Sequence, residues 1–344
     1  MRGNRRKIGS LLVIFCLTLG LALPLAGCGK TEPVTKESYY FDTVCDITIY
    51  DMEGMSEDRA EKAIRGAFRQ CSYYEDTLSK TVKGSDIWKI NHAAGKPVRV
   101  SDVTLAVLRD GIRFGDLTKG TFDITVGKAE DLYDFHAEKH AVPTDRQLEQ
   151  AVKYIDYRQI RISGNRVSMG TAKGEVDLGG IAKGYIADRV ARYLKQKWKV
   201  SSGIISLGGN IVCIGSKNGE SFNVGIDRPF SDRSEIVGST KVKDATLVTS
   251  GVYERYFRKN GKLYHHILDP KTGRPVNTDI LGVTVVAPDG RSANCDALAT
   301  TCLILGKQDA LRFMKKHFPS YKVLIVDRKY KVTKSKNMAF QPAD

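Results

Sequence analysis

Cysteine pairs of the kind that bind zinc or cycle between thiol and disulfide are absent from this sequence. Seven cysteines occur in 344 residues, and no two of them form a CxxC pair, so neither a zinc ribbon nor a redox motif is indicated. The chain also shows no internal repeat, and its basic residues are spread along it rather than gathered in one block. The sequence therefore indicates an ordinary globular protein and not a disulfide-stapled scaffold.

The first 27 residues have the order of a secretory signal. A short basic region, residues 1–7, precedes an almost wholly apolar stretch, residues 8–26, that ends in small residues. Charges, apolar stretch and cleavage site in that order are typical of exported proteins. Leu25-Ala26-Gly27-Cys28 resembles the lipobox of bacterial lipoproteins, so we expect cleavage before Cys28 and acylation of its thiol. The alternative is an uncleaved anchor, because about 20 apolar residues suffice to span a bilayer.

These features divide the chain into three parts. Residues 1–27 are the expected signal peptide, and residues 28–38 are a polar, proline-containing tether that holds the folded part off the membrane. Residues 39–340 are the expected folded domain. The expected location is extracytoplasmic, with a lipid anchor in the cell membrane or in an inner membrane facing the periplasm.

The charge balance favours an anionic partner without identifying it. Residues 1–27 hold four basic and no acidic residues, so the exported part of 317 residues has 50 basic and 39 acidic side chains, a formal net charge of +11. Such a surplus suits nucleic acid, anionic lipid or a phosphorylated ligand. Export argues against nucleic acid as a partner, and an ordinary solvated surface explains the spread of basic residues equally well.

Most of the cysteines are expected to be buried thiols. Cys16 leaves with the signal peptide and Cys28 carries the lipid. The others are Cys45, Cys71, Cys213, Cys295 and Cys302. Their number is odd and their spacing is wide, which is more typical of small core residues than of disulfides.

Hydrophobic periodicity predicts a mixed fold. Apolar residues at helical spacing predict helices over residues 56–78, 102–118, 144–154, 181–197, 294–305 and 308–317. Alternating and β-branched stretches predict strands over residues 39–50, 204–214, 222–226, 245–249, 263–268 and 281–286, with hairpins over residues 157–169 and 322–333. Because strands and helices do not alternate strictly, an α+β fold is favoured over a doubly wound parallel sheet.

Two glycine-rich segments are candidates for ligand contact. Residues 177–185, DLGGIAKGY, place glycines where a strand gives way to a helix. Such a turn lets backbone approach a ligand and points free helical N–H groups toward anions. Residues 205–210, ISLGGN, indicate either a flexible strand beside a ligand or a bulge. Neither segment is specific alone, since such glycines more often form simple turns.

A third segment, residues 264–275, YHHILDPKTGRP, carries two adjacent histidines on a predicted strand. Adjacent strand residues point to opposite faces, so only one of His265 and His266 can reach a site. An imidazole titrates in the range of acid–base catalysis, although a lone strand histidine is more often structural.

The fourth segment, residues 292–301, SANCDALATT, places Asp296 and Thr300 at i and i+4 on one helix face. A carboxylate and a hydroxyl are oxygen ligands that suit a hard cation such as Mg2+. The alternative is an acid that complements the positive end of the helix dipole.

In this order and spacing, DLGGIAKGY, SLGGNI, YHHILDPKTGRP and SANCDALATT resemble the ApbE family of FAD:protein FMN transferases, which are commonly exported lipoproteins. The resemblance runs from about Tyr39 to the C-terminal hairpin. It implies mixed, largely antiparallel sheets with flanking helices. It also implies Mg2+-dependent transfer of FMN from FAD to a serine or threonine hydroxyl of an exported acceptor protein, with release of AMP. The implied cofactor is Mg2+, and the implied partners are FAD and that acceptor protein.

The resemblance further implies roles for individual residues. FAD would contact Phe41, in a Phe41-Asp42-Thr43 segment where many relatives have Met-Gly-Thr, and also Thr121, Phe122, Asp123, Asp177 and Lys183. Metal would be held by the backbone carbonyl of Gly180 with Asp296, Thr300 and the carbonyl of Ala299. His266 is the implied proton-transfer residue, and Cys28 is the lipidation site.

Two other functions remain open on the sequence alone. If water replaced the acceptor hydroxyl, the same site would make an exported Mg2+-dependent FAD pyrophosphatase that yields FMN and AMP. A non-catalytic flavin-binding lipoprotein would have no need of Asp296, Thr300 or His266, all of which are present. The transferase is therefore the favoured interpretation.

Overall fold

The computed structural model describes residues 32–50, 54–135, 140–231 and 234–343. The predicted signal peptide and Cys28 lie outside the described residues. Of the helices that are described, none combines the length and the apolar character needed to span a bilayer.

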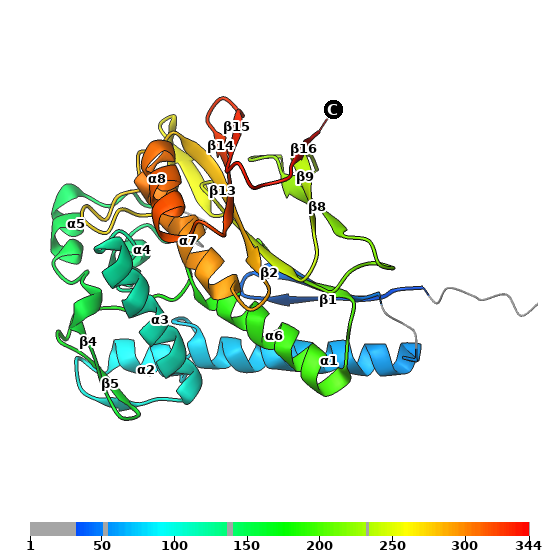
Figure 1. Cartoon of the computed structure of the whole chain (residues 1–344). Coiled ribbons are helices and arrows are strands. Elements are labelled where there is room, and N and C mark those ends of the chain that lie inside the picture. The colour runs from blue at the N-terminus through cyan, green and yellow to red at the C-terminus, as the bar shows by residue number, and fades with distance from the viewer. Residues whose placement is uncertain (1–31, 51–53, 136–139, 232–233, 344) are drawn as a thin grey trace, which may run out of the picture. The chain divides into compact units, whose positions relative to one another are not determined.

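An eight-stranded sheet forms the centre of the fold (Figure 1). Its strand order is β1-β2-β6-β7-β10-β13-β14-β15, and every neighbouring pair is antiparallel. The strands are β1 Val34–Tyr40, β2 Thr43–Ile49, β6 Gly203–Leu207, β7 Asn210–Ile214, β10 Ala245–Gly251, β13 Ile280–Pro288, β14 Lys322–Asp327 and β15 Val332–Lys334. The predicted α+β class with largely antiparallel sheets is confirmed.

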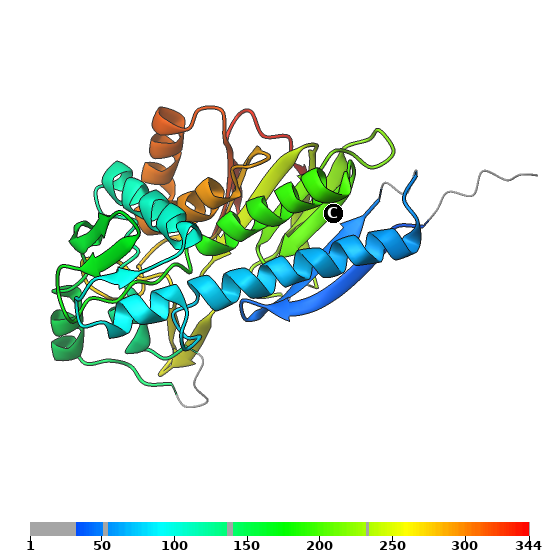
Figure 2. The ribbon, with the colours of Figure 1, turned by 90° about the horizontal axis from the view of Figure 1, so that it is seen from below.

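Helices cover one face of this sheet, and a small sheet covers the other. In β13, Val285 packs with the helices, while its neighbour Val286 packs under the small sheet, as the alternation of strand side chains requires. The covering helices are α1 Glu57–Leu78, α6 Ala182–Trp198 and α7 Ser292–Leu305. Figure 2 shows α1 and α6 side by side. The small sheet has the order β16-β9-β8 and consists of β8 Phe222–Asp227, β9 Ile236–Val242 and β16 Gln341–Pro342.

The remaining elements pack beside these layers. The helices are α2 Asp86–His92, α3 Asp102–Thr118, α4 Gly127–Asp131, α5 Asp145–Val152 and α8 Lys307–His317, with a 3-10 turn at Tyr157–Gln159. The strands are β3 Val98–Arg99, β4 Ile160–Ser163 and β5 Arg166–Met169, which form one sheet, and β11 Tyr256–Lys259 and β12 Lys262–His265, which form a hairpin.

Side-chain caps set the starts of three of the predicted helices. Ser56 accepts a hydrogen bond from a backbone N–H of α1, and Ser101 does the same for α3. Thr144 and Gln147 form a reciprocal capping box at α5. A cap of this kind satisfies N–H groups that would otherwise lack a partner, and it typically contributes about 1 kcal/mol.

Two predicted strands are wrong, because each is a hairpin. Residues 39–50 are split by a turn at Phe41 and Asp42, which have φ values of 55° and 58°. Neither residue is a glycine or a proline, so the alternating pattern runs through the turn without a visible break. β1 also takes in residues 34–38, which the sequence analysis places in the tether. Residues 204–214 are split at Gly208-Gly209, where Gly208 has a φ of 67°.

The five cysteines among the described residues are buried and free, as predicted. Burial raises the pKa of Cys213 and of Cys302 to about 12. These thiols therefore stay protonated at neutral pH and act as small core side chains.

Candidate active site

Segments that are far apart in the sequence converge on one cleft. It is lined by the β1–β2 turn, the loop after α3, the turn that opens α6, the β6–β7 turn, the end of β10, the segment after β12 and one face of α7. Two adjoining cavities of about 180 and 680 Å³ make up the cleft, and Asp177, Gly179 and Lys183 line both of them. The cleft therefore extends from one cavity into the other.

Helix α7 presents Asp296, Thr300 and Ile304 to the cleft. Their spacing of four residues places them on one helical face, as the sequence predicts for the first two. Helical spacing is therefore enough to predict that the Asp296 carboxylate and the Thr300 hydroxyl lie at one site.

The start of α7 is capped by a residue of another helix. α7 has no side-chain cap of its own, and its Ser292 and Ala293 N–H groups donate to the Asp188 carboxylate of α6 at 3.0 and 3.2 Å. Burial raises the pKa of Asp188 to about 6, although these two donors oppose the rise. The Asp188 carboxylate thus fixes α6 and α7 to each other.

Asp296 is a buried carboxylate that forms no ion pair among the described residues. It is 3% exposed, and its Oδ2 accepts from the Gly184 N–H at 2.9 Å and from Asn210 Nδ2 at 3.2 Å. Burial raises its pKa, while the charge of Lys183 and the two donors oppose that rise. A carboxylate in this environment would be stabilised by a cation.

The oxygens around Asp296 fit a magnesium ion. Asn210 Oδ1 is buried without a partner in the described structure. Thr300 Oγ1 lies 3.6 Å from the place that a Cβ on Gly180 would take, so the Gly180 backbone is close to the hydroxyl. The described residues contain no cluster of three His, Cys, Asp or Glu side chains that could hold a metal. Mg2+ is usually bound by one or two carboxylates together with phosphate oxygens of a substrate, and these residues match that pattern.

The glycine turn positions the N-terminus of α6 against α7. A Cβ on Gly184 would lie 2.3 Å from the backbone oxygen of Ser292, so only glycine allows the approach that brings its N–H to Asp296. α6 has no side-chain cap, and Lys183 lies in its first turn beside the cleft. The positive end of the helix dipole and the Lys183 ammonium both favour an anionic group at this point.

The two adjacent histidines lie in different environments. His266 lines the cleft, whereas His265 is 4% exposed and does not line it. His266 Nδ1 lies 3.2 Å from the carbonyl oxygen of Arg255. Because a carbonyl only accepts, Nδ1 carries the hydrogen and Nε2 is the basic nitrogen. Burial, together with the charges of Arg255 and Lys183, lowers the pKa of His266 to about 3, so its ring is neutral at pH 7.

The loop after α3 lines the cleft with Thr121, Phe122 and Asp123. The Asp123 carboxylate is engaged within the fold: it accepts from the Thr125 N–H at 2.8 Å, the Thr125 hydroxyl at 2.6 Å and the Tyr157 N–H at 3.0 Å. Asp123 therefore holds the loop in shape.

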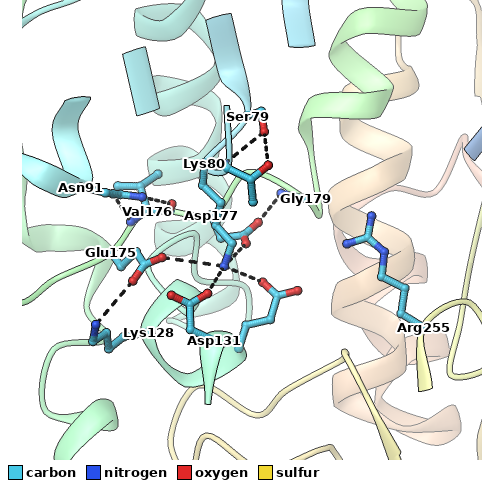
Figure 3. Close-up of polar contacts among 12 residues, drawn as sticks. Ser79, Lys80, Asn91, Lys128, Asp131, Glu175, Val176, Asp177, Gly179 and Arg255 are labelled. Carbon is cyan, nitrogen blue, oxygen red and sulfur yellow. Dashed lines mark hydrogen bonds and ion pairs between the residues drawn. The ribbon is translucent and has the colours of Figure 1, made fainter. Parts of the chain in front are cut away.

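Lys80 is surrounded by four carboxylates at the second cavity (Figure 3). Its Nζ lies 2.8 Å from Asp131, 3.1 Å from Asp177, 3.3 Å from Glu130 and 3.8 Å from Glu175. Burial and the charge of the neighbouring Asp177 raise the pKa of Glu130 well above its usual value, and the two carboxyl groups form a hydrogen bond with each other. Burial alone would raise the pKa of Asp177, but this hydrogen bond and the charge of Lys80 hold it below its usual range.

The structure brings most of the predicted site residues together. Those that line the cleft are Phe41, Thr121, Phe122, Asp123, Asp177, Gly180, Lys183, His266, Asp296 and Thr300. Ala299 is fully buried and does not line the cleft, so a metal contact through its carbonyl stays a prediction. The individual roles of the lining residues also stay predictions.

Sequence reasoning misses Lys80 and Arg255. Each is a charged residue in an irregular segment, with no motif around it, and only the folded chain shows that it lies at the cleft. Asn210 could have been found, because it is the polar residue directly after the Gly208-Gly209 turn.

Helices on one face of an antiparallel sheet and a small sheet on the other define an α+β protein, and its cleft gathers Lys183, His266 and Asp296. The model of the ApbE family matches residues 41–325. The chain belongs to the ApbE family.

Relatives in two bacteria carry the name FAD:protein FMN transferase. The protein of Treponema pallidum is 30% identical over 331 residues, which cover 91% of this chain and 90% of the relative. The protein of Vibrio cholerae is 32% identical over 297 residues, which cover 85% of this chain and 87% of the relative.

Solved structures show the same fold. The ApbE protein of Thermotoga maritima superposes with a TM-score of 0.80 at 27% identity, covering 89% of this chain and 97% of the other. The flavin transferase ApbE of Vibrio cholerae gives a TM-score of 0.77 at 28% identity, covering 88% and 96%.

Proposed function

We propose that this protein transfers FMN from FAD to a serine or threonine hydroxyl of an exported acceptor protein, with Mg2+ as cofactor and AMP as the second product. The relatives named FAD:protein FMN transferase support this class of reaction. The observation that carries the proposal is the convergence of Asp296, Lys183 and His266 on one cleft.

His266 acts as the general base. The acceptor oxygen forms a bond to the phosphorus of the FMN half, the bond from that phosphorus to the AMP oxygen breaks, and the hydroxyl proton passes to Nε2 of His266. Nε2 is available because Nδ1 donates to the Arg255 carbonyl and the ring is neutral at pH 7. A positioned base contributes about 10²–10⁴ in rate when its pKa lies near the working pH, and the negative charge of a bound pyrophosphate would raise the pKa of His266 toward that range.

Positive charge in the cleft offsets the charge of the pyrophosphate. Lys183, in the first turn of α6, places a positive charge that favours phosphate oxygens there. Asp296, Thr300 and the Gly180 carbonyl would hold Mg2+, which neutralises charge on the pyrophosphate and on the leaving AMP. Asn210 keeps the Asp296 carboxylate in position through its hydrogen bond.

Export and lipid anchoring are part of the same proposal. The basic, apolar and small-residue order of residues 1–27 and the lipobox cysteine, Cys28, support them. The acceptor would then lie on the same side of the membrane as the anchored enzyme.

The test combines the purified protein with FAD, MgCl2 and candidate exported acceptors. We expect a flavin-fluorescent band on a denaturing gel, release of AMP in equal amount, and loss of both with a chelator. FMN released free in solution would show a pyrophosphatase. FAD that stays bound and intact would show a flavin-binding protein, and either result would contradict the proposal.

A further inference from the structure

A third cavity of about 270 Å³, here called the side groove, adjoins the cleft at the β6–β7 turn. It shares Gly208, Gly209, Thr249 and Glu254 with the cleft. The wall between the two is closely packed main chain, because the Thr249 N–H donates to the Gly209 carbonyl at 2.9 Å and a Cβ on Gly209 would lie 2.5 Å from the Thr249 carbonyl oxygen. Only glycine allows so thin a wall between the side groove and the cleft.

One wall of the side groove is an open strand edge. In the described structure β8 pairs with β9 and has no strand on its other side. Gly225 and Asp227 of β8 line the side groove. Alternate residues of an edge strand leave backbone N–H and C=O groups free to pair with an added extended chain. The six residues of β8 are long enough to pair with a short peptide segment.

The opposite wall is aromatic. Tyr256 is 40% exposed and meets Phe230 edge to face at 5.2 Å, and Phe230 also packs on Tyr253 at 5.8 Å. Phe230 has a φ of 63°, a conformation that costs a non-glycine residue about 1–2 kcal/mol. The fold thus holds a strained aromatic residue against a half-exposed one, and rigid aromatic pairs of this kind anchor peptide side chains well.

We propose that the side groove binds the segment of the acceptor protein that carries the modified hydroxyl, in extended form and paired with β8. The inference rests on the proposed function, because only a protein acceptor needs a peptide site. The segment would run along the thin wall at Gly208 and Gly209, and its serine or threonine would extend over that wall into the cleft that His266 lines. FAD and the acceptor would then enter the reaction from different sides.

The test uses short synthetic peptides with one central threonine, and the peptide that accepts FMN best serves as the probe. Tyr256→Ala removes part of the aromatic wall, and Gly225→Leu narrows the strand side, where a Cβ meets the flexible Ile236 side chain at 3.1 Å. Each should raise KM for the peptide by about tenfold or more, with an unchanged Kd for FAD. Tyr73→Ala is the matched control, since Tyr73 is 48% exposed and lines none of the three cavities.

Hydrogen exchange on the parent protein gives an answer that does not depend on a variant's folding. Peptide binding should slow exchange of the β8 amides, and FAD alone should not. Unchanged KM in both variants, or unchanged β8 exchange with transfer intact, would overturn the side groove and leave the proposed function standing. No transfer to any peptide or protein would overturn both. A dimer that Gly225→Leu converts to a monomer would assign the side groove to a second copy of the chain and overturn the inference.

Discussion

The imidazole of His266 depends on its neighbours for its protonation state. Its Nδ1 faces the Arg255 carbonyl, so Nε2 is the base. We expect His266→Ala to reduce single-turnover FMN transfer by at least about 10² while FAD still binds, because a general base acts on the transition state more than on the bound substrate.

His265→Ala is the comparison variant. His265 is buried away from the cleft, so its loss should lower the free energy of unfolding more than it slows transfer. If FMN transfer is slowed more in His265→Ala than in His266→Ala, then His266 is not the base.

Asp296 supplies the only carboxylate in the proposed metal set. We expect Asp296→Ala to abolish Mg2+-dependent turnover, as measured by AMP release over a MgCl2 titration. Asp296→Asn is the matched control, because it keeps an oxygen for the Gly184 N–H and removes only the charge. It should also be inactive, and it should melt no lower than the parent because a buried charge is gone. Full activity in either variant at ordinary Mg2+ concentrations would refute the metal assignment.

At this scale the sequence predicts residues that stand in motifs and misses those brought in by folding. Asp296 and Thr300 are recognisable because helical spacing alone places them on one face. Lys80 cannot be recognised in this way, since its four carboxylate partners come from segments about 50 to 100 positions away. No local sequence pattern predicts contacts over that separation. Asp123 lies at the cleft, as its motif predicts, but its carboxylate accepts hydrogen bonds within the fold and holds the loop in shape. The motif alone does not reveal this second role.

Between elements, Lys80 connects three segments at the cleft. It lies just after α1 and holds Glu130 and Asp131 of α4 together with Glu175 and Asp177 before α6. Its ammonium is largely buried, with 17% of the side chain exposed. The Lys80 ammonium thus holds together four acidic side chains at the second cavity that would otherwise repel one another.

We expect Lys80→Met to lower the free energy of unfolding by about 3–5 kcal/mol at pH 7, because it leaves buried carboxylates without their cation. Burial raises the pKa of Glu175 to about 7 in the parent, and loss of Lys80 raises the pKa of these carboxyls further. A raised carboxyl pKa favours the folded state at low pH and loses that effect as pH rises through the pKa. The loss of unfolding free energy caused by Lys80→Met should therefore be smaller at pH 5 than at pH 7, as measured by urea denaturation.

Lys62→Met is the control for this prediction. Lys62 pairs only with Asp58 on the surface of α1, and both side chains are more than half exposed, so the change should be about 0–1 kcal/mol. Equal effects of the two lysines, or a Lys80→Met deficit that does not depend on pH, would contradict the role given to the cluster.

The longer helices and the hairpins over residues 157–169 and 322–333 could be predicted from the sequence, whereas the β1–β2 and β6–β7 hairpins could not. Ser56, Ser101 and Thr144 mark helix starts by local hydrogen bonds that the sequence displays. The β1–β2 turn at Phe41 and Asp42 has no such marker, because its positive φ values are imposed by the pairing of the two strands around it. Phe41 adds a hydrogen bond from its N–H to Glu75 of α1, a contact that only the folded chain supplies.

For the whole molecule, we expect the chain to be held on a membrane by its N-terminus. Cys28→Ala should release the protein into the soluble fraction or leave an unprocessed precursor, because the acylated thiol is then missing. Cell fractionation with immunoblotting measures this, and Cys213→Ala serves as the control, since that thiol is buried in the folded domain. A Cys28→Ala variant that fractionates and migrates as the parent does would contradict lipid anchoring.

The cap that Asp188 gives to α7 joins positions 104 residues apart. Until the chain between them has closed, the first N–H groups of α7 lack their partner, and the helix that carries Asp296 has no fixed start. Contacts this distant form later in folding than hairpins between neighbouring strands, because a longer loop must be ordered first. The start of the helix that carries Asp296 is therefore set late, after the local hairpins and at the stage when other distant segments, such as β2 and β6, also meet.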